Sequence, residues 1–171
     1  MIKIKTLLLA TITLIFAFTL HAQNEYKFTI EKELPHTPAR DQGNAGTCWS
    51  YATTSFIESE LLRKGKEETD LSELFFVNYA YRAKAQTYVM RHGTANFSQG
   101  GQAHDVMNVI KNHGIITEQS YTGKAYESEK HNHDDLEALL SGMLKNLIKV
   151  REKIPLWPQA IQSVIDIYLG E

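Results

Sequence analysis

The spacing of apolar side chains predicts a chain built mainly from helices. After residue 48, side chains suited to a buried stripe recur at helical spacing: Trp49, Ala52, Thr53, Phe56, Ile57 and Leu61. No charged residue lies between Asp41 and Glu58. We therefore expect this helix to be central in the fold, with Trp49, Phe56 and Ile57 in the core. Its later turns, from Glu58 onward, carry charges and are expected to reach solvent.

Two further helices are predicted from their start and stop signals. Ser72 is placed to cap a helix whose apolar stripe continues to about Met90. Residues 103–112 predict a short helix that ends at Gly114. The inward side chains of this short helix are expected to be Val106, Val109 and Ile110.

The remaining segments predict two more helices and little strand. The helices are expected at residues 136–150 and 158–169, and a proline opens the second. A strand is expected only at residues 26–30, within an extended segment that two prolines interrupt. The apolar pattern therefore favours a mainly helical domain.

The first 22 residues have the pattern of an export signal. Lys3 and Lys5 precede an uncharged apolar run from Leu7 to Leu20, and Ala22 offers a small residue for cleavage. The run is too short to span a bilayer comfortably. We predict a signal peptide at residues 1–22, an extended lead-in at 23–40, a helical lobe at 41–171, and a periplasmic or secreted protein with no stable membrane span after cleavage. An uncleaved N-terminal anchor is the alternative.

Composition and charge narrow the classes of function. The chain has 18 basic and 20 acidic residues, and residues 1–22 hold two of the lysines and no acid. The excess of acid argues against a nucleic-acid or anionic-membrane partner, which would need a basic face. One cysteine cannot form an internal disulfide. In an oxidising compartment such a thiol is either buried and inert or kept for chemistry.

The surroundings of Cys48 indicate a nucleophile. The thiol opens the predicted helix, whose positive end favours a thiolate, and the hydroxyl of Thr47 is placed to cap the first turn. Gln42 lies six residues upstream across a glycine-bearing loop. Its side-chain amide is a suitable donor to a developing oxyanion, with the backbone N–H of Cys48 as the second donor.

These motifs resemble a known family. Gln42, Cys48 and Trp49, with Gly46 between them, resemble the active-site signature of papain-like cysteine peptidases. Leu-Ser-Glu-Leu-Phe-Phe at 71–76 and Gly-Gly-Gln-Ala-His-Asp-Val at 100–106 are similar to the bleomycin hydrolase and aminopeptidase C branch. The resemblance covers residues 37–171. Ala45 and Ser98 stand where papain has a disulfide.

The resemblance implies a fold, a reaction and a substrate. The fold would be α+β, of the papain-like type, with this chain forming mainly the helical N-terminal lobe. Cys48 would form a thioester acyl-enzyme, with Gln42 as oxyanion donor. Gly100 and Gly101, together with Trp49, would bind a peptide or protein substrate. The resemblance implies no metal or other cofactor, and it allows a homo-oligomer.

The catalytic base is expected outside these residues. In papain-like enzymes a histidine and an orienting asparagine come from a second, β-rich lobe, and no histidine follows His133 in this chain. We therefore interpret the chain as the N-terminal part of a longer enzyme, inactive by itself. Two alternatives are an inactive helical binding or structural module and another exported cysteine hydrolase, such as a cell-wall amidase. The spacing of Gln42 and Cys48 disfavours the amidase.

Two groups of polar residues could suggest other chemistry. His104 and Asp105 are adjacent on a predicted helix, where neighbours point about 100° apart, so we expect scaffold and no catalytic pair. Residues 131–135 read His-Asn-His-Asp-Asp and could in principle hold a metal. Because they lie in a charged loop just before a helix, we predict a solvated surface and a helix start.

Overall fold

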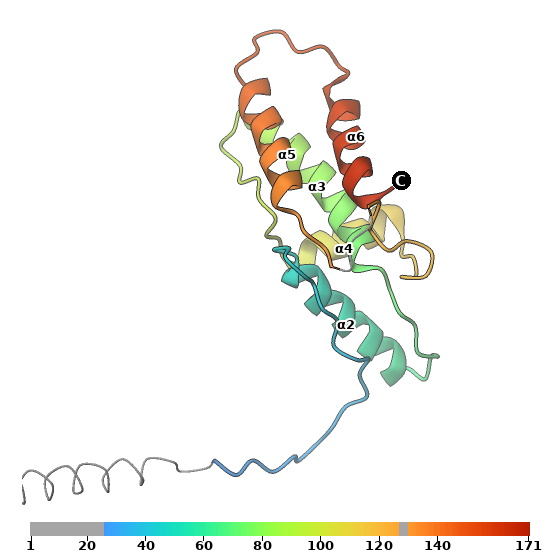
Figure 1. Ribbon diagram of the computed structural model, residues 1–171. Coiled ribbons are helices and arrows are strands. Elements are labelled where there is room, and N and C mark those ends of the chain that lie inside the picture. The colour runs from blue at the N-terminus through green and yellow to red at the C-terminus, as the bar shows by residue number, and fades with distance from the viewer. Residues whose placement is uncertain (1–25, 127–129) are drawn as a thin grey trace, which may run out of the picture. The chain divides into compact units, whose positions relative to one another are not determined.

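A computed structural model describes residues 26–126 and 130–171 (Figure 1). The chain divides into two units at residues 33 and 34, and the helices named below all belong to the second unit, residues 34–171. The predicted signal peptide lies outside the described residues. Within these ranges the helices are α2 (Cys48–Arg63), α3 (Glu73–Met90), α4 (Ala103–His113), α5 (Asp134–Leu147) and α6 (Trp157–Leu169).

The predicted strand at residues 26–30 does not form. These residues have no regular structure, and Tyr26, Phe28 and Ile30 are exposed. An isolated strand has no neighbour to take up its backbone hydrogen bonds, which explains the error. Over the described parts of the chain, extended pairing is limited to two single bridges, which join Asn44 to Asn132 and Leu71 to Thr117.

Helix α3 is the centre of the unit, so the prediction of a central Cys48 helix was wrong. In residues 34–171, α3 contacts α2, α4, α5 and α6, whereas α2 contacts only α3 and α4. Figure 1 shows α5 and α6 alongside α3. Phe76 and Val77 are fully buried. The Ser72 hydroxyl accepts a hydrogen bond from the Phe75 N–H at 3.2 Å, which confirms the predicted cap.

The three remaining helices confirm the predicted elements within a few residues. Val106 and Val109 of α4 are buried, Ile110 packs against the core, and Gly114 ends the helix at φ +84°. Helix α5 begins two residues earlier than predicted and ends at Leu147. Its buried face consists of leucines one turn apart, which pack on α3 and α6: Leu136, Leu140 and Leu144.

The apolar stripe predicted for α2 matches the buried face only in part: Trp49 and Thr53 are buried as predicted, each 8% exposed. Phe56 is 65% exposed, and Ile57 is only partly buried. Apart from Trp49, the buried side chains of this helix are small or polar: Ser50, Thr53, Thr54 and Glu58. Small side chains let α2 approach α3 closely, and the Ser50 hydroxyl donates to the Glu73 carbonyl at 2.8 Å. The prediction that Phe56 is buried was therefore wrong.

Glu58 was expected in solvent but is 5% exposed. Its carboxylate accepts hydrogen bonds from the Thr37 hydroxyl at 2.5 Å and from the Leu71 N–H at 2.8 Å. A buried polar group is tolerated when its hydrogen bonds are made. Glu58 thus connects α2 to Thr37, which precedes the helix in the chain, and to Leu71, which follows it.

Candidate active site

Cys48 is the first residue of α2, and its thiol is free and exposed. The first N–H groups of a helix have no acceptor within the helix, so the backbone N–H of Cys48 is available to an oxyanion. Thr47 precedes the helix, but its buried hydroxyl makes no hydrogen bond within the described structure. The predicted capping role of this hydroxyl is wrong. The backbone carbonyl of Thr47 instead accepts a hydrogen bond from the Ser50 N–H at 2.8 Å, which closes the first turn.

The side chain of Gln42 is tied to the loop that leads to Cys48. Its Nε2 atom donates to the Ala45 carbonyl at 2.5 Å. A primary amide nitrogen has two hydrogens, so this bond orients the group and leaves one donor for a ligand. Gly43 beside it has φ +65°, and a Cβ at this position would lie 2.5 Å from the His131 carbonyl oxygen. The loop can therefore make this turn only with glycine.

One side of the loop is held by residues 131–134. The Asn44 N–H donates to the His131 carbonyl at 2.8 Å, and the His133 N–H donates to the Asn44 carbonyl at 3.1 Å. The Asn44 side chain also donates to Asp134 at the start of α5, at 2.8 Å. A segment almost 90 residues away in the chain thus fixes the approach to Cys48.

The solvated surface and helix start predicted at residues 131–135 are confirmed in part: Asn132, Asp134 and Asp135 are exposed and Asp134 begins α5, but His131 and His133 are 6% and 1% exposed. Nδ1 of His133 lies 3.3 Å from the Tyr81 hydroxyl. Burial lowers the pKa of each histidine to about 4, so both rings are neutral near pH 7. In the described parts of the chain no three His, Cys, Asp or Glu side chains are placed to hold a metal.

The other side of the loop is held by Gln99. Its side-chain oxygen accepts the Gly46 N–H at 2.5 Å, and its backbone carbonyl accepts the Trp49 indole N–H at 3.0 Å. Lys84 of α3 adds hydrogen bonds to the carbonyls of Ser98 and Gly100. Residues 98–101 are therefore fixed next to the start of α2.

Gly100 and Gly101 have different surroundings. A Cβ on Gly101 would lie 2.6 Å from Cε2 of the Trp49 ring, so any side chain there would collide with the indole. A Cβ on Gly100 would meet only the Ser98 hydroxyl, at 3.8 Å. Trp49 itself is 8% exposed. The indole thus supports the backbone of Gly101, while Gly100 remains open to an approaching chain.

His104 lies in the first turn of α4 and is largely exposed. Its Nε2 atom is 3.5 Å from Oδ1 of Asp105, and no hydrogen bond joins the two side chains. The other oxygen of Asp105 accepts the Gln102 N–H at 2.9 Å in a capping box. Asp105 therefore serves the start of the helix.

Sequence reasoning missed three residues that position this site: Asn44, Lys84 and Gln99. Each acts through a partner in another segment, between 14 and 90 residues away, which spacing along one segment cannot reveal. The one usable signal was closeness in the sequence to predicted site residues: Gln99 directly precedes the glycine pair, and Asn44 lies between Gln42 and Cys48. Polar side chains in such places are candidates for holding a loop.

Comparisons with known proteins agree with this geometry. The family model described as "Papain family cysteine protease" matches residues 26–160. A cathepsin L-like peptidase of Aedes aegypti is 33% identical over 96 residues, which cover 56% of this chain and 25% of the relative. Cysteine proteinase 1 of Entamoeba histolytica is 29% identical over 136 residues, or 77% of this chain and 39% of the relative. The chain thus spans between a quarter and two fifths of the length of these relatives.

Proposed function

Because the chain belongs to the papain family of cysteine proteases, we propose that it carries the nucleophile half of a peptidase active site. The observation that carries the proposal is the exposed thiol of Cys48 at the start of α2, with the Gln42 amide oriented beside the same loop. The thiolate sulfur attacks the scissile carbonyl carbon, and the oxyanion accepts hydrogen bonds from the Cys48 N–H and the Gln42 amide. The amine leaves with a proton, and water then hydrolyses the thioester and restores the thiol.

The base that moves these protons belongs, in our proposal, to a second lobe outside residues 1–171. One face of α2 supports this view, because it is exposed, uncharged and bears the thiol. The residues of this face are Cys48, Ala52, Ser55 and Phe56. A contiguous uncharged surface of this kind, with Phe56 and Ala52 side by side on the helix, is consistent with a protein interface. A lobe that covers this face would bring its histidine to Cys48.

The substrate is proposed to be a peptide that runs along Gly100 and Gly101. The fixed backbone of residues 98–101 and the open side of Gly100 support this role. Trp49 contributes because its indole ring packs against the backbone of Gly101. We place the enzyme in the aminopeptidase C branch on the motifs at residues 71–76 and 100–106 alone, since the relatives above have cathepsin L-like and cysteine proteinase names.

We also propose that the protein is exported, on the pattern of residues 1–22. The described helices include none with the length and apolar character needed to cross a membrane. A fusion of residues 1–30 to a reporter enzyme that is active only outside the cytoplasm tests this. Activity that is lost when Lys3 and Lys5 become glutamate supports export, and a reporter that stays in the cytoplasm contradicts it.

The activity test uses the protein expressed from its complete gene and peptides that release a fluorescent amine. Cys48→Ser is expected to abolish hydrolysis. Gln42→Ala should lower kcat about 100- to 1,000-fold, as for loss of one oxyanion donor. Gln162→Ala, which removes an exposed amide on α6, is the matched control and should change nothing. Full activity in Cys48→Ser would refute the proposal.

Substrates with and without a free amino terminus test separately whether the enzyme is an aminopeptidase and whether it is a cysteine peptidase at all. An aminopeptidase should cleave an unprotected dipeptide substrate and leave its N-acetylated form intact. Equal cleavage of both forms would contradict the aminopeptidase assignment and leave the cysteine peptidase intact. Absence of all cleavage, in a protein whose Cys48 shows no enhanced alkylation, would favour the inactive binding module.

A further inference from the structure

The connection between α5 and α6, residues 148–156, exposes large apolar side chains at the end of the hairpin that these two helices form. Figure 1 shows this connection at the end of residues 34–171 that lies away from α2. Val150, Ile154 and Leu156 are 47%, 72% and 64% exposed. We call residues 148–157, which add the half-buried Trp157 at the start of α6, the hairpin tip.

The apolar side chains of the hairpin tip share one surface. The residues that line a hollow of about 370 Å³ include Val150, Ile154, Leu156 and Trp157. A second hollow, of about 340 Å³, shares Val150 and Trp157 with the first and continues onto α5. The exposed side chains therefore form one contiguous apolar patch, and such a patch marks an interaction site.

Positive charge is concentrated at and next to the hairpin tip, although the chain as a whole has a net charge of −2. Residues 138–165 contain four basic side chains and one acid, Glu152, so this segment carries +3. The basic residues are Lys145, Lys149, Arg151 and Lys153. The rest of the chain therefore carries −5. The overall excess of acid, which argued against an anionic membrane as a partner, conceals a local basic surface.

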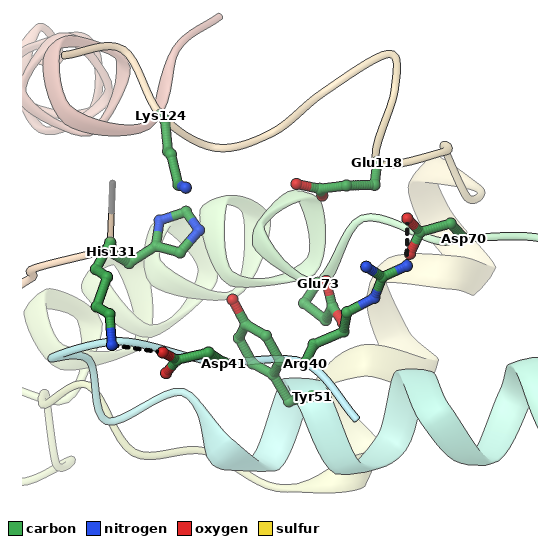
Figure 2. Close-up of a pocket in the computed structure, with 9 residues that line it drawn as sticks. Arg40, Asp41, Tyr51, Asp70, Glu73, Glu118, Lys124 and His131 are labelled. Carbon is green, nitrogen blue, oxygen red and sulfur yellow. Dashed lines mark ion pairs between the residues drawn. The ribbon is translucent and has the colours of Figure 1, made fainter. Parts of the chain in front are cut away.

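The cations of the hairpin tip form no ion pair with any described residue. Beside the Cys48 loop the situation differs, because Figure 2 shows Arg40 paired with Asp70, at 2.7 Å. At the tip, the Lys153 ammonium instead donates to the Val150 carbonyl at 2.7 Å, which is a neutral acceptor. The excess positive charge of the tip is thus available to an anionic partner.

We propose that the hairpin tip docks reversibly on the surface of an anionic lipid bilayer. The aliphatic side chains and Trp157 would enter the boundary between headgroups and acyl chains, and the cations would stay at the level of the phosphates. Residues 148–156 have no helix to satisfy their backbone N–H and C=O groups, so the loop itself remains at the hydrated headgroup depth. The tip would dock without a span, since among the described helices none could cross a membrane.

The composition of the hairpin tip favours a bilayer over a protein partner. Lysine is depleted at protein interfaces, whereas lysine, arginine and tryptophan beside aliphatic side chains are typical of segments at membrane surfaces. Three of the four cations are lysines: Lys145, Lys149 and Lys153. A second copy of the chain fits less well, because two tips in contact would bring like charges together.

Docking through the hairpin tip would leave Cys48 accessible. Asp134, at the start of α5, accepts a hydrogen bond from Asn44 of the Cys48 loop, and the tip follows the other end of the same helix. A helix of 14 residues is about 20 Å long, which separates the bilayer surface from the loop. Substitutions in the tip should therefore leave peptide hydrolysis unchanged.

The experiment measures how much protein sediments with lipid vesicles. The protein is expressed from its complete gene without residues 1–22, because their apolar run would bind lipid by itself. Vesicles of phosphatidylcholine alone are compared with vesicles that also contain phosphatidylglycerol. The wild type should bind the anionic vesicles, bind the neutral ones at least about tenfold more weakly, and be released by salt.

Single substitutions in the hairpin tip separate charge from apolar contact. Arg151→Gln should weaken binding to anionic vesicles about fivefold, as for loss of one cation near the surface. Ile154→Ser should weaken it about tenfold, as for loss of a large side chain from an apolar environment. The matched controls are Lys66→Gln, in the exposed loop after α2, and Ile167→Ser, which is 68% exposed on α6. Both controls should bind as the wild type does, and a thermal transition shows that each variant is folded.

Several results would overturn the proposal. The wild type could fail to bind either kind of vesicle at millimolar lipid, or bind both equally, which would remove the role of charge. Binding that is unchanged in Arg151→Gln and Ile154→Ser would place the lipid contact on another face, such as the exposed face of α2. Binding of polyglutamate without binding of anionic vesicles would assign the tip to an acidic protein. Self-association that is lost in Ile154→Ser, without vesicle binding, would assign the tip to a second copy.

Discussion

Helices α2 and α3 pack against each other but are buried by different kinds of side chain. Helix α3 buries large apolar residues and touches every other described helix of its unit. Helix α2 buries small and polar residues, holds Glu58 inside through two hydrogen bonds, and leaves Phe56 exposed. Helix α3 holds the unit together by apolar burial. Helix α2 is positioned by specific hydrogen bonds, and its apolar face stays available for another surface.

The largest difference is expected between two phenylalanines, one on each helix. Phe76→Ala should lower the free energy of unfolding of the 171-residue chain by about 3–5 kcal/mol, because it opens a cavity in a fully buried site. Phe56→Ala should change it by less than about 0.5 kcal/mol, as at an exposed site. Urea unfolding measures both. A large loss in Phe56→Ala would mean that this face is already covered, for example by a second copy of the chain.

Glu58 tests whether polar contacts hold α2 in place. Glu58→Ala removes the acceptor of the Thr37 hydroxyl and leaves the Leu71 N–H buried without a partner. We expect a loss of about 2–3 kcal/mol in the free energy of unfolding. Glu60→Ala, which removes an exposed partner of Arg63 one turn away, is the control and should have little effect. Similar losses in the two variants would show that helix content alone was affected.

The two glycines near Trp49 test how closely the loop packs on α2. Gly101→Ala should destabilise the chain by about 1–3 kcal/mol, since its methyl group would collide with the indole. Gly100→Ala would make only an ordinary contact with the Ser98 hydroxyl, at 3.8 Å, and should be close to neutral. Urea unfolding followed by circular dichroism measures both variants, since tryptophan fluorescence would combine the signals of Trp49 and Trp157. Equal effects would contradict the close packing of Gly101 on Trp49.

The buried titrating groups should give opposing pH dependences. His131 and His133 have lowered pKa values, so the unfolded chain binds their protons more readily and stability falls as the pH drops from 6.5 to about 4. Glu73 and Glu118 have raised pKa values, so the folded chain binds their protons more readily and stability falls as the pH rises from 4.5 to about 7. The two dependences largely cancel between pH 5 and 6.5 in the wild type.

Variants should separate these two contributions. His133→Asn should make stability fall more steeply with rising pH, by up to about 1.4 kcal/mol per pH unit relative to the wild type. Glu118→Gln should shift the slope in the opposite direction by a similar or smaller amount. The slope of the urea midpoint between pH 5 and 6.5 is the measurement, because both variants also change absolute stability. Equal slopes in the wild type and both variants would show that His133 and Glu118 do not cause these pH dependences.

Local signals in the sequence predicted most of the helices and the place of the nucleophile. Ser72, Gly114 and Pro158 each act within one turn of their own helix, by a hydrogen bond, a positive φ or a fixed φ, so the surrounding fold has little influence on them. The motif around Cys48 is local in the same way. Its thiol therefore opens α2 as the spacing of residues 42–49 predicted.

Only the tertiary structure decided which side chains are buried and which residues hold the site. The 3.6-residue period defines a stripe on α2, but the choice of face depends on α3 and on partners such as Leu71, whose N–H donates to Glu58. In the same way, His131 and His133 lie in a polar stretch but are buried, and their backbone pairs with Asn44, almost 90 residues away. Contacts of this kind depend on the path of the whole chain, which no local pattern contains.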